Sequence, residues 1–321
     1  MSELPPQRSV LSPVVIMLAG LVLLAGSVAS FFLVGRGGAG DVGAGVSQPY
    51  RGVIFEGRLP VSSGEAGSRV LLMGSMHVLR PQDHPLPVSY GRAFELADAV
   101  IFELDSAVDQ TLVQKHTTYA DGSTLQEHLP ADLYERASAA AERAGISMKE
   151  MANKRVYLLA QGLAGSVLGR AGFTRSWGVE AQLRDKAAQA GKPVFGFEMA
   201  EDQLSVFSSL SADREEALLR QTLDEMEKRP DYGLRGIELW KTGDVDALAA
   251  LREESKVSDP ELARTLFEDR HARWLPVIEE QLTALETPEM TLLVVVGAAH
   301  LCGKGSLIEL LHERGYAIEQ W

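Results

Sequence analysis

The hydrophobic and polar residues of this 321-residue chain fall into three regions of different pattern. Between Arg8 and Arg36 no residue is charged, and most are apolar. A glycine-rich stretch follows, and from Tyr50 onward short apolar runs alternate with longer segments of helical periodicity, which is typical of an α/β protein. We therefore expect a membrane anchor or signal segment at 1–36, a linker at 37–49 and one α/β domain at 50–321.

The uncharged N-terminal run is long enough to cross a membrane. It holds 27 residues, and a helix needs about 20 apolar residues to span a bilayer. A cleaved signal peptide would end near Ala25–Ala29, but Phe31–Val34 continues the hydrophobicity past that point. We therefore favour an uncleaved transmembrane helix over a signal peptide, tethered to the domain by the flexible glycine-rich linker.

Five short apolar runs predict the strands of a central sheet. They are Val53–Phe55, Val70–Met73, Val100–Phe102, Val194–Phe197 and Leu292–Val296. A Pro/Ser/Gly-rich stretch separates the first two, which favours an antiparallel hairpin. Helical patterns predict helices at Tyr90–Ala97, Ala131–Ala144, Val179–Ala190, Gln203–Lys228, Val245–Glu254, Pro260–Leu285 and Ser306–Glu313. The segments 106–192 and 199–290, which flank the strand at 194–197, contain no convincing strand of their own. They should therefore form helical layers around the sheet.

Composition and missing motifs narrow the function classes. The formal net charge of −13 argues against nucleic-acid binding, which needs a basic face. The single cysteine, Cys302, excludes an internal disulfide and a Cys-rich zinc site, and we expect it to be a small buried residue rather than a nucleophile. The chain has neither a His-Glu-x-x-His helix nor a Gly-x-Ser-x-Gly elbow, which excludes an ordinary zincin and counts against an α/β-hydrolase.

Two segments of the chain share a pattern that points to chemistry. Each is an apolar strand followed by Gly-x-x-His, and the histidines are His77 and His300. Two other predicted strands end in carboxylates, Glu103 and Glu198. Sites in open α/β sheets lie outside the carboxyl ends of the strands, so these four residues should converge if their strands are parallel neighbours. Two imidazoles with one or two carboxylates suit a divalent transition metal.

Ordinary structural roles are an equally weighted alternative for these residues. A lone Gly-x-x-His carries little information, and a glutamate just beyond a strand is often only the first solvated position. We interpret the other histidines as surface residues: His84, His116, His128, His271 and His312. The helix around His271 nevertheless has a packed face, indicated by Leu266, Trp274 and Ile278.

A longer series of motifs runs through the domain in a fixed order. It comprises Gly74–Val78 with Pro85–Pro87, Phe102–Asp105, Asp121–Leu125, Gly178–Glu180, Gly191–Glu198 with Gln203, Trp240–Asp244, Arg270, and Gly297–Leu301 with Gly303, Gly305 and Gly315–Tyr316. Together these motifs resemble the TraB/GumN family, over roughly Gly52 to Trp321. Two positions depart from the family pattern: Ser75 stands where Thr is usual, and His271 replaces the Asn expected after Arg270.

The resemblance implies a fold and a chemistry. The fold is that of the ChaN-like and erythromycin-esterase-like (EreA) proteins, a central mixed β-sheet flanked by helices. The animal relatives, the Tiki proteins, are membrane-tethered metalloproteases in which paired Gly-x-x-His motifs and a glutamate support a divalent metal. Carried over to this chain, His77, His300 and Glu103 would bind manganese, cobalt or zinc, with Glu103 as third ligand or general base. Glu198 would be a further ligand or a support behind the ligands, and Arg270 would stabilise an oxyanion or hold a substrate carboxylate.

These observations together predict a membrane-anchored metal-dependent hydrolase with its soluble domain outside the cytoplasm, in the periplasm if the source is bacterial. Its substrate would be a peptide or protein, its membrane contact the N-terminal helix, and nucleic acid is not expected as a partner. The alternative is a non-catalytic protein on the same fold that sequesters a peptide or haem. Haem would need one or two axial histidines and a broad apolar cleft. A weaker possibility is a decayed site whose domain only scaffolds a membrane partner.

Overall fold

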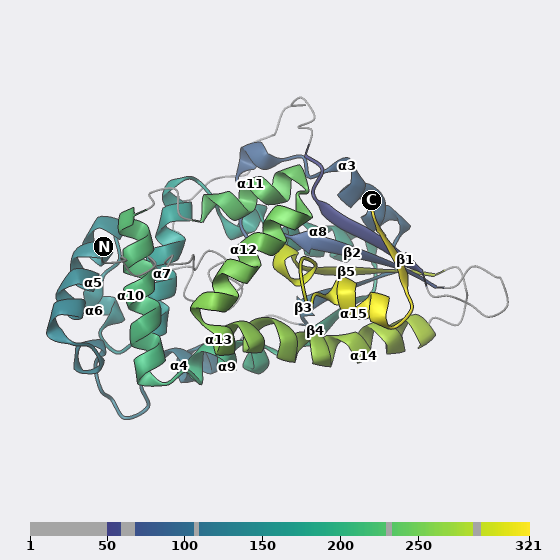
Figure 1. Ribbon diagram of the computed structural model, residues 1–321. Coiled ribbons are helices and arrows are strands. Elements are labelled where there is room, and N and C mark those ends of the chain that lie inside the picture. The colour runs from purple at the N-terminus through teal and green to yellow at the C-terminus, as the bar shows by residue number, and fades with distance from the viewer. Residues whose placement is uncertain (1–49, 59–67, 106–108, 229–232, 285–289) are drawn as a thin grey trace, which may run out of the picture.

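The computed structural model of the chain describes residues 50–58, 68–105, 109–228, 233–284 and 290–321 (Figure 1). The predicted membrane segment at 1–36 and linker at 37–49 lie outside these residues. Within the described ranges, every helix is too short or too polar to cross a bilayer.

One six-stranded sheet forms the centre of the described domain, with the strand order β4-β3-β5-β2-β1-β6. Its strands are β1 (Val53–Arg58), β2 (Arg69–Ser75), β3 (Ala99–Leu104), β4 (Val194–Glu198), β5 (Thr291–Gly297) and β6 (Ala317–Gln320). The five predicted strands and the antiparallel pairing of β1 with β2 are confirmed. The strands β2, β5, β3 and β4 run parallel, so the sheet is mixed, as expected. The last strand, β6, was not predicted; it pairs antiparallel with β1.

The central strands are the most deeply buried part of the sheet. The segments Val70–Met73, Val100–Phe102 and Leu292–Val296 are at most 1% exposed at every residue. Parallel strands are covered on both faces, which explains why they are continuous apolar runs rather than alternating ones. Each buried aliphatic side chain contributes about 1.5–3 kcal/mol, so these strands form a rigid base for the polar residues at their ends.

Helices make up most of the remaining described chain. They are α3 (Val88–Leu96), α4 (Gln110–Thr117), α5 (Ala131–Ala144), α6 (Met148–Met151), α7 (Val156–Arg170), α8 (Val179–Ala190), α9 (Ala200–Ser208), α10 (Ala212–Lys228), α11 (Leu234–Thr242), α12 (Val245–Ser258), α13 (Pro260–Ala263), α14 (Asp269–Ala284) and α15 (Leu307–Glu313). The single helix predicted at Gln203–Lys228 was wrong, because the chain leaves the helix at 209–211 and divides it into α9 and α10. Serine side chains there compete with the helix for backbone hydrogen bonds.

The crossover connections place helices on both faces of the sheet. The chain passes from β2 through α3 to β3, and from β3 to β4 with α8 directly before β4. Both connections move in the same direction across the sheet. It then returns from β4 to β5 through α14 and continues through α15 to β6. Right-handed crossovers therefore put α3 and α8 on one face and α14 and α15 on the other. The packing of α14 against both α15 and β4 agrees with this arrangement.

A group of helices lies beyond the carboxyl ends of the parallel strands, at the left of Figure 1. We call it the helical lobe; it comprises α4, α5, α6, α7, α9 and α10. Within it α10 packs on α7 and α5, and α4 packs on α9. As predicted, the described residues of 109–192 and 199–284 contain no strand of the sheet.

The segment from Pro260 to Ala284 is nearly continuous helix, as predicted, but it is not uniform. Between α13 and α14 lies a π-helical turn, η5 (Arg264–Glu268). Such turns insert an extra residue into a helix and are frequent at functional sites. Here the turn immediately precedes Arg270 and His271, which reach the carboxyl edge of the sheet.

Candidate metal site at the carboxyl edge of the sheet

Four neighbouring parallel strands end at the same edge and carry the predicted site residues. Ser75 of β2 lies opposite Gly297 of β5, and Leu104 of β3 lies opposite Glu198 of β4. The four residues of the sequence prediction come from these strands or from the turns directly after them: His77, Glu103, Glu198 and His300. Glu103, Glu198 and His300 are buried and His77 is partly exposed.

His77, Glu103 and His300 face a common point above the backbone of Gly297. A methyl group on Gly297 would lie 3.3 Å from Glu103 Oε1 and 3.5 Å from His77 Nε2. The same methyl would lie 3.5 Å from Cδ2 of His300, whose Nε2 is 3.8 Å from Glu103 Oε1. The Gly297 amide fixes the carboxylate by donating to Glu103 Oε1 at 2.7 Å. The glycine of the second Gly-x-x-His motif thus leaves space that any side chain would fill.

Glu180 holds the other side of the His77 ring. Its Oε1 lies 2.6 Å from His77 Nδ1 and also accepts a hydrogen bond from the Ser75 hydroxyl. Donor atoms of His77, Glu103 and Glu180 all lie within 4.8 Å of one another. Glu180 therefore belongs to the site, although the sequence analysis gave it no role.

A close backbone approach brings Glu180 to this position. A side chain at Gly178 would have its Cβ 2.2 Å from the His77 carbonyl oxygen, so only glycine fits there. The next amide, that of Val179, donates to the Met76 carbonyl at 2.9 Å. These contacts place the first turn of α8 against the end of β2, and a carboxylate in a first turn is favoured by the helix dipole.

The pKa values of His77 and Glu180 shift in opposite directions because the two groups form an ion pair. Burial alone would lower the pKa of His77, but the Glu180 carboxylate more than offsets this and raises it above the ordinary value. Burial would likewise raise the pKa of Glu180, whereas the imidazole and the Ser75 hydroxyl lower it. The pair is charged at any pH between the two pKa values.

Arg270 of α14 connects the carboxylates of two strands. Its Nη2 donates to Glu103 Oε2 at 2.7 Å, and its Nε donates to both oxygens of Glu198, at 3.0 and 3.1 Å. Its Nη1 lies 3.2 Å from Nε2 of His300. Burial would lower the pKa of Arg270, but the two carboxylates raise it. Each guanidinium nitrogen is thus engaged within the protein, so in this arrangement Arg270 holds Glu103, Glu198 and His300 in place.

Glu198 is surrounded by donors rather than by the other carboxylates. Besides Arg270, it accepts from the indole of Trp274 at 2.9 Å and from Arg273 at 3.1 Å. Like His300, it lies outside the donor cluster of His77, Glu103 and Glu180, and unlike His300 it has no atom among the three nearest to a methyl on Gly297. Glu198 is therefore placed as the anchor of Arg270, and its role as a metal ligand stays a prediction that the geometry does not support.

His300 is neutral at neutral pH. Burial lowers its pKa well below the ordinary value, and the positive charge of Arg270 lowers it further. Its Nδ1 lies 2.8 Å from Nε2 of His271, and Nδ1 of His271 lies 2.7 Å from the Gly305 carbonyl oxygen.

The interpretation of His271 and His116 as surface residues was wrong, because both are buried. His116 bridges two helices of the helical lobe, with contacts to Ser208 at 2.6 Å and Glu201 at 2.9 Å. His84 and His128 are partly buried and His312 is exposed. The packed face around His271 was the available signal, since the neighbours that suggested it are buried too.

Comparison with known proteins gives the same family that the motifs suggested. The model of the TraB/PrgY/gumN family matches residues 61–320. The chain belongs to the TraB/PrgY/gumN family. The uncharacterized protein YbaP of Escherichia coli K12 is 25% identical over 245 residues, which are 75% of this chain and 86% of YbaP. YbaP of Shigella flexneri has the same identity and coverage. No solved structure matches the chain.

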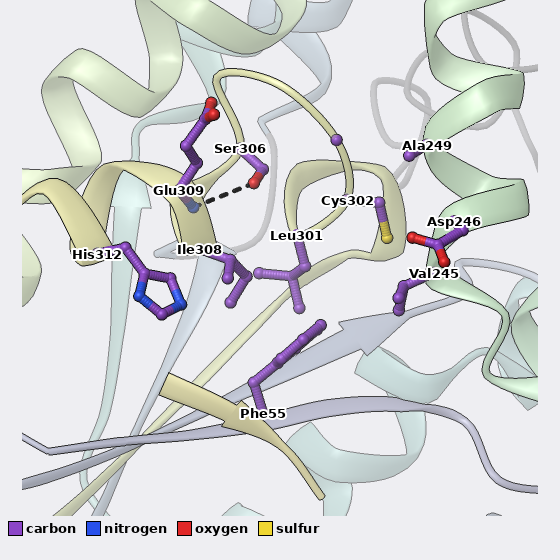
Figure 2. Close-up of a pocket in the computed structure, with 11 residues that line it drawn as sticks. Phe55, Val245, Asp246, Ala249, Leu301, Cys302, Ser306, Ile308, Glu309 and His312 are labelled. Carbon is purple, nitrogen blue, oxygen red and sulfur yellow. Dashed lines mark hydrogen bonds between the residues drawn. The ribbon is translucent and has the colours of Figure 1, made fainter. Parts of the chain in front are cut away.

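This member of the TraB/PrgY/gumN family also has a cavity that neither His77 nor His300 lines. Its volume is about 390 Å³, and its walls include Phe55, Val245, Leu301, Cys302 and Ile308 (Figure 2). None of the residues that face Gly297 lines it. Cys302 is buried as predicted and donates to the Ala298 carbonyl at 3.2 Å. Burial raises the pKa of its thiol to about 12, so Cys302 is not an activated nucleophile.

Proposed function

We propose that this protein is a membrane-anchored, extracytoplasmic metal-dependent hydrolase that acts on peptides. One observation carries the proposal: the histidines of both Gly-x-x-His motifs and the carboxylate of Glu103 face one point above Gly297. The two motifs lie on adjacent parallel strands, so their similarity in sequence corresponds to similar positions in the site.

The donor set fits a divalent transition metal. Two imidazoles and one carboxylate are ligands that manganese, cobalt and zinc accept. The Nδ1 of His77 is occupied by Glu180, which leaves Nε2 for a metal, and a carboxylate behind a ligating histidine is a common feature of metal sites. His77, His300 and Glu103 would therefore hold the metal, with Glu180 behind His77.

A metal bound there would polarise a substrate carbonyl and lower the pKa of a coordinated water. The residues of the chain have three further tasks. Glu103 serves as the third ligand or accepts a proton from the attacking water. Arg270 fixes the Glu103 carboxylate through Oε2, and Glu198 fixes Arg270 in turn. The substrate class, the periplasmic or extracellular location and the membrane anchor rest on the resemblance to the Tiki proteins and on the apolar run before Arg36.

Metal binding by the full-length protein tests the proposal. The purified chain would be titrated with manganese, cobalt and zinc, beside His77→Ala, His300→Ala and the control His312→Ala, which removes an exposed histidine. We expect one metal per chain in the wild type and the control, loss of binding in both site variants, and cleavage of a peptide library by the loaded wild type. Normal metal binding by the double variant His77→Ala/His300→Ala would refute the site.

The same samples separate this proposal from the sequestering alternative. A Soret band on haem titration that disappears in His77→Ala or His300→Ala, together with no metal binding by the wild type, would favour a haem-binding protein. His300 is only 2% exposed, so axial ligation by this residue would require the site to open.

A further inference from the structure

A chain of hydrogen bonds runs from a loop carbonyl through two histidines to Arg270. The Gly305 oxygen lies 2.7 Å from Nδ1 of His271, and Nε2 of His271 lies 2.8 Å from Nδ1 of His300. At the other end, Nε2 of His300 lies 3.2 Å from Nη1 of Arg270. Both histidines are buried, at 0% and 2% exposure, so these contacts are shielded from solvent.

Only one assignment of protons satisfies all of these contacts. A carbonyl oxygen can only accept, so Nδ1 of His271 carries a proton, and a guanidinium can only donate, so Nε2 of His300 does not. A neutral His300 must then carry its proton on Nδ1, which donates it to Nε2 of His271. The opposite direction would place an N–H of His300 against an N–H of Arg270.

We propose that His271 is a positioning residue that locks His300 in its Nδ1–H tautomer and so keeps Nε2 free of a proton, with its lone pair facing Arg270 Nη1 at 3.2 Å and Glu103 Oε1 3.8 Å away. The tautomer follows from the hydrogen bonds alone, whereas its value for metal binding rests on the proposed function. A histidine in this tautomer binds a metal through Nε2, because that nitrogen carries no proton; a metal there would replace the hydrogen bond from Arg270.

The arrangement around the other histidine supports the inference. Nδ1 of His77 is held by Glu180, just as Nδ1 of His300 is held by His271. In both cases an acceptor stands behind the ring, and the opposite edge of the ring faces the point above Gly297. Both Gly-x-x-His histidines therefore have Nδ1 held by an acceptor, a carboxylate on α8 and an imidazole on α14, although the atom nearest the point above Gly297 is Nε2 in His77 and Cδ2 in His300.

The experiment measures the tautomer directly. The full-length protein would be labelled with ¹⁵N-histidine, stripped of metal and studied by long-range ¹H–¹⁵N NMR at about pH 7.5, where an ordinary histidine is neutral. The spectrum of His300→Gln identifies the His300 signals. The informative variants are His271→Phe, which keeps a ring but has no acceptor, and His271→Gln, whose side-chain oxygen can accept the Nδ1 proton.

We expect His300 to be protonated on Nδ1 in the wild type and in His271→Gln, and to lose this preference in His271→Phe. Cobalt affinity should fall by about 10- to 100-fold in His271→Phe and recover in His271→Gln, as for other residues behind a metal ligand. If His271→Phe unfolds, the wild type and His271→Gln still decide the question. A proton on Nε2 of His300 in the wild type, or an unchanged tautomer in a folded His271→Phe, would overturn the inference. The expected tautomer in a protein that binds no metal would leave it standing and reject the proposed function.

Discussion

Glu180 Oε1 lies 2.6 Å from Nδ1 of His77, and this contact joins the end of β2 to the first turn of α8. Gly178 makes it possible, because its lack of a side chain lets the helix start directly against the His77 carbonyl. The Ser75 hydroxyl donates to the same carboxylate oxygen. The orientation of His77 is therefore set by α8, which follows His77 in the sequence only after α4, α5, α6 and α7 of the helical lobe.

Replacing Glu180 tests whether this contact supports metal binding. In Glu180→Gln the negative charge behind His77 is lost while the shape is kept. We expect metal affinity to fall by about 10- to 100-fold. The matched control is Glu201→Gln, since Glu201 pairs with His116 at 2.9 Å in the helical lobe. Titration calorimetry of both variants gives the comparison, and equal metal affinities would contradict the role of Glu180.

A methyl group at Gly297 should damage the site more than the fold. In Gly297→Ala the new methyl would lie 3.3 to 3.5 Å from three site residues, so it occupies the point that they face. We expect a loss of metal affinity of at least about tenfold, or about 1.4 kcal/mol of binding free energy. The control Gly91→Ala places a methyl in α3 with nothing within 4 Å and should stabilise the helix by about 0.5–1 kcal/mol. Unchanged metal binding by Gly297→Ala would place the metal elsewhere.

Removing Arg270 should destabilise the protein far more than removing its neighbour Arg273. Arg270→Ala leaves Glu103 and Glu198 buried without their shared partner, which typically costs about 3–5 kcal/mol. The side chain of Arg273 is 52% exposed, and an exposed ion pair contributes at most about 1 kcal/mol. Urea denaturation measures both free energies of unfolding. Similar losses in Arg270→Ala and Arg273→Ala would mean that Arg270 does not connect the two strands as described.

Acid should destabilise the metal-free protein in part through His300. Burial and then Arg270 lower its pKa well below the ordinary 6.5. Between those two values the unfolded chain binds a proton that the folded chain does not, so the free energy of unfolding falls as the pH drops below 6.5. One such group contributes up to about 1.4 kcal/mol per pH unit.

The comparison that isolates this effect is between the wild type and His300→Gln. The free energies of unfolding are measured at about pH 7.5 and 5.5, because these two pH values lie on either side of the ordinary histidine pKa. The wild type should lose about 1 kcal/mol more than the variant on acidification. His84, whose pKa burial also lowers, is present in both proteins and cancels. Equal losses would show that His300 is charged in the folded state.

The parts of the fold that the sequence reveals are those governed by local pattern. The runs Val70–Met73 and Leu292–Val296 are apolar at every position because parallel strands are buried on both faces, so they were recognisable as strands. The strand β6 has only Ile318 buried, and its pairing with β1 gives no comparable signal. The paired Gly-x-x-His motifs were recognisable for the same local reason, since each glycine directly follows a run of apolar residues.

The two site residues that were not predicted from the sequence, Glu180 and His271, are positioned by packing between distant segments. Glu180 reaches His77 only because α8 starts against β2, and His271 reaches His300 only because α14 crosses the strand ends. Neither contact produces a recognisable spacing of residues in the sequence. Glu198 shows the converse: its place at a strand end correctly put it at the edge of the sheet, but Trp274 and two arginines of α14 surround it there.

The π-helical turn η5 sets the rotation of the helix that follows it. Each residue turns an α-helix by about 100°, so shortening Arg264–Glu268 by one residue would rotate all of α14 by about that angle. Arg270 and His271 would then point away from the sheet with every side chain of the site still present. The number of residues in this turn, which no substitution alters, is therefore as decisive for the site as the identity of its ligands.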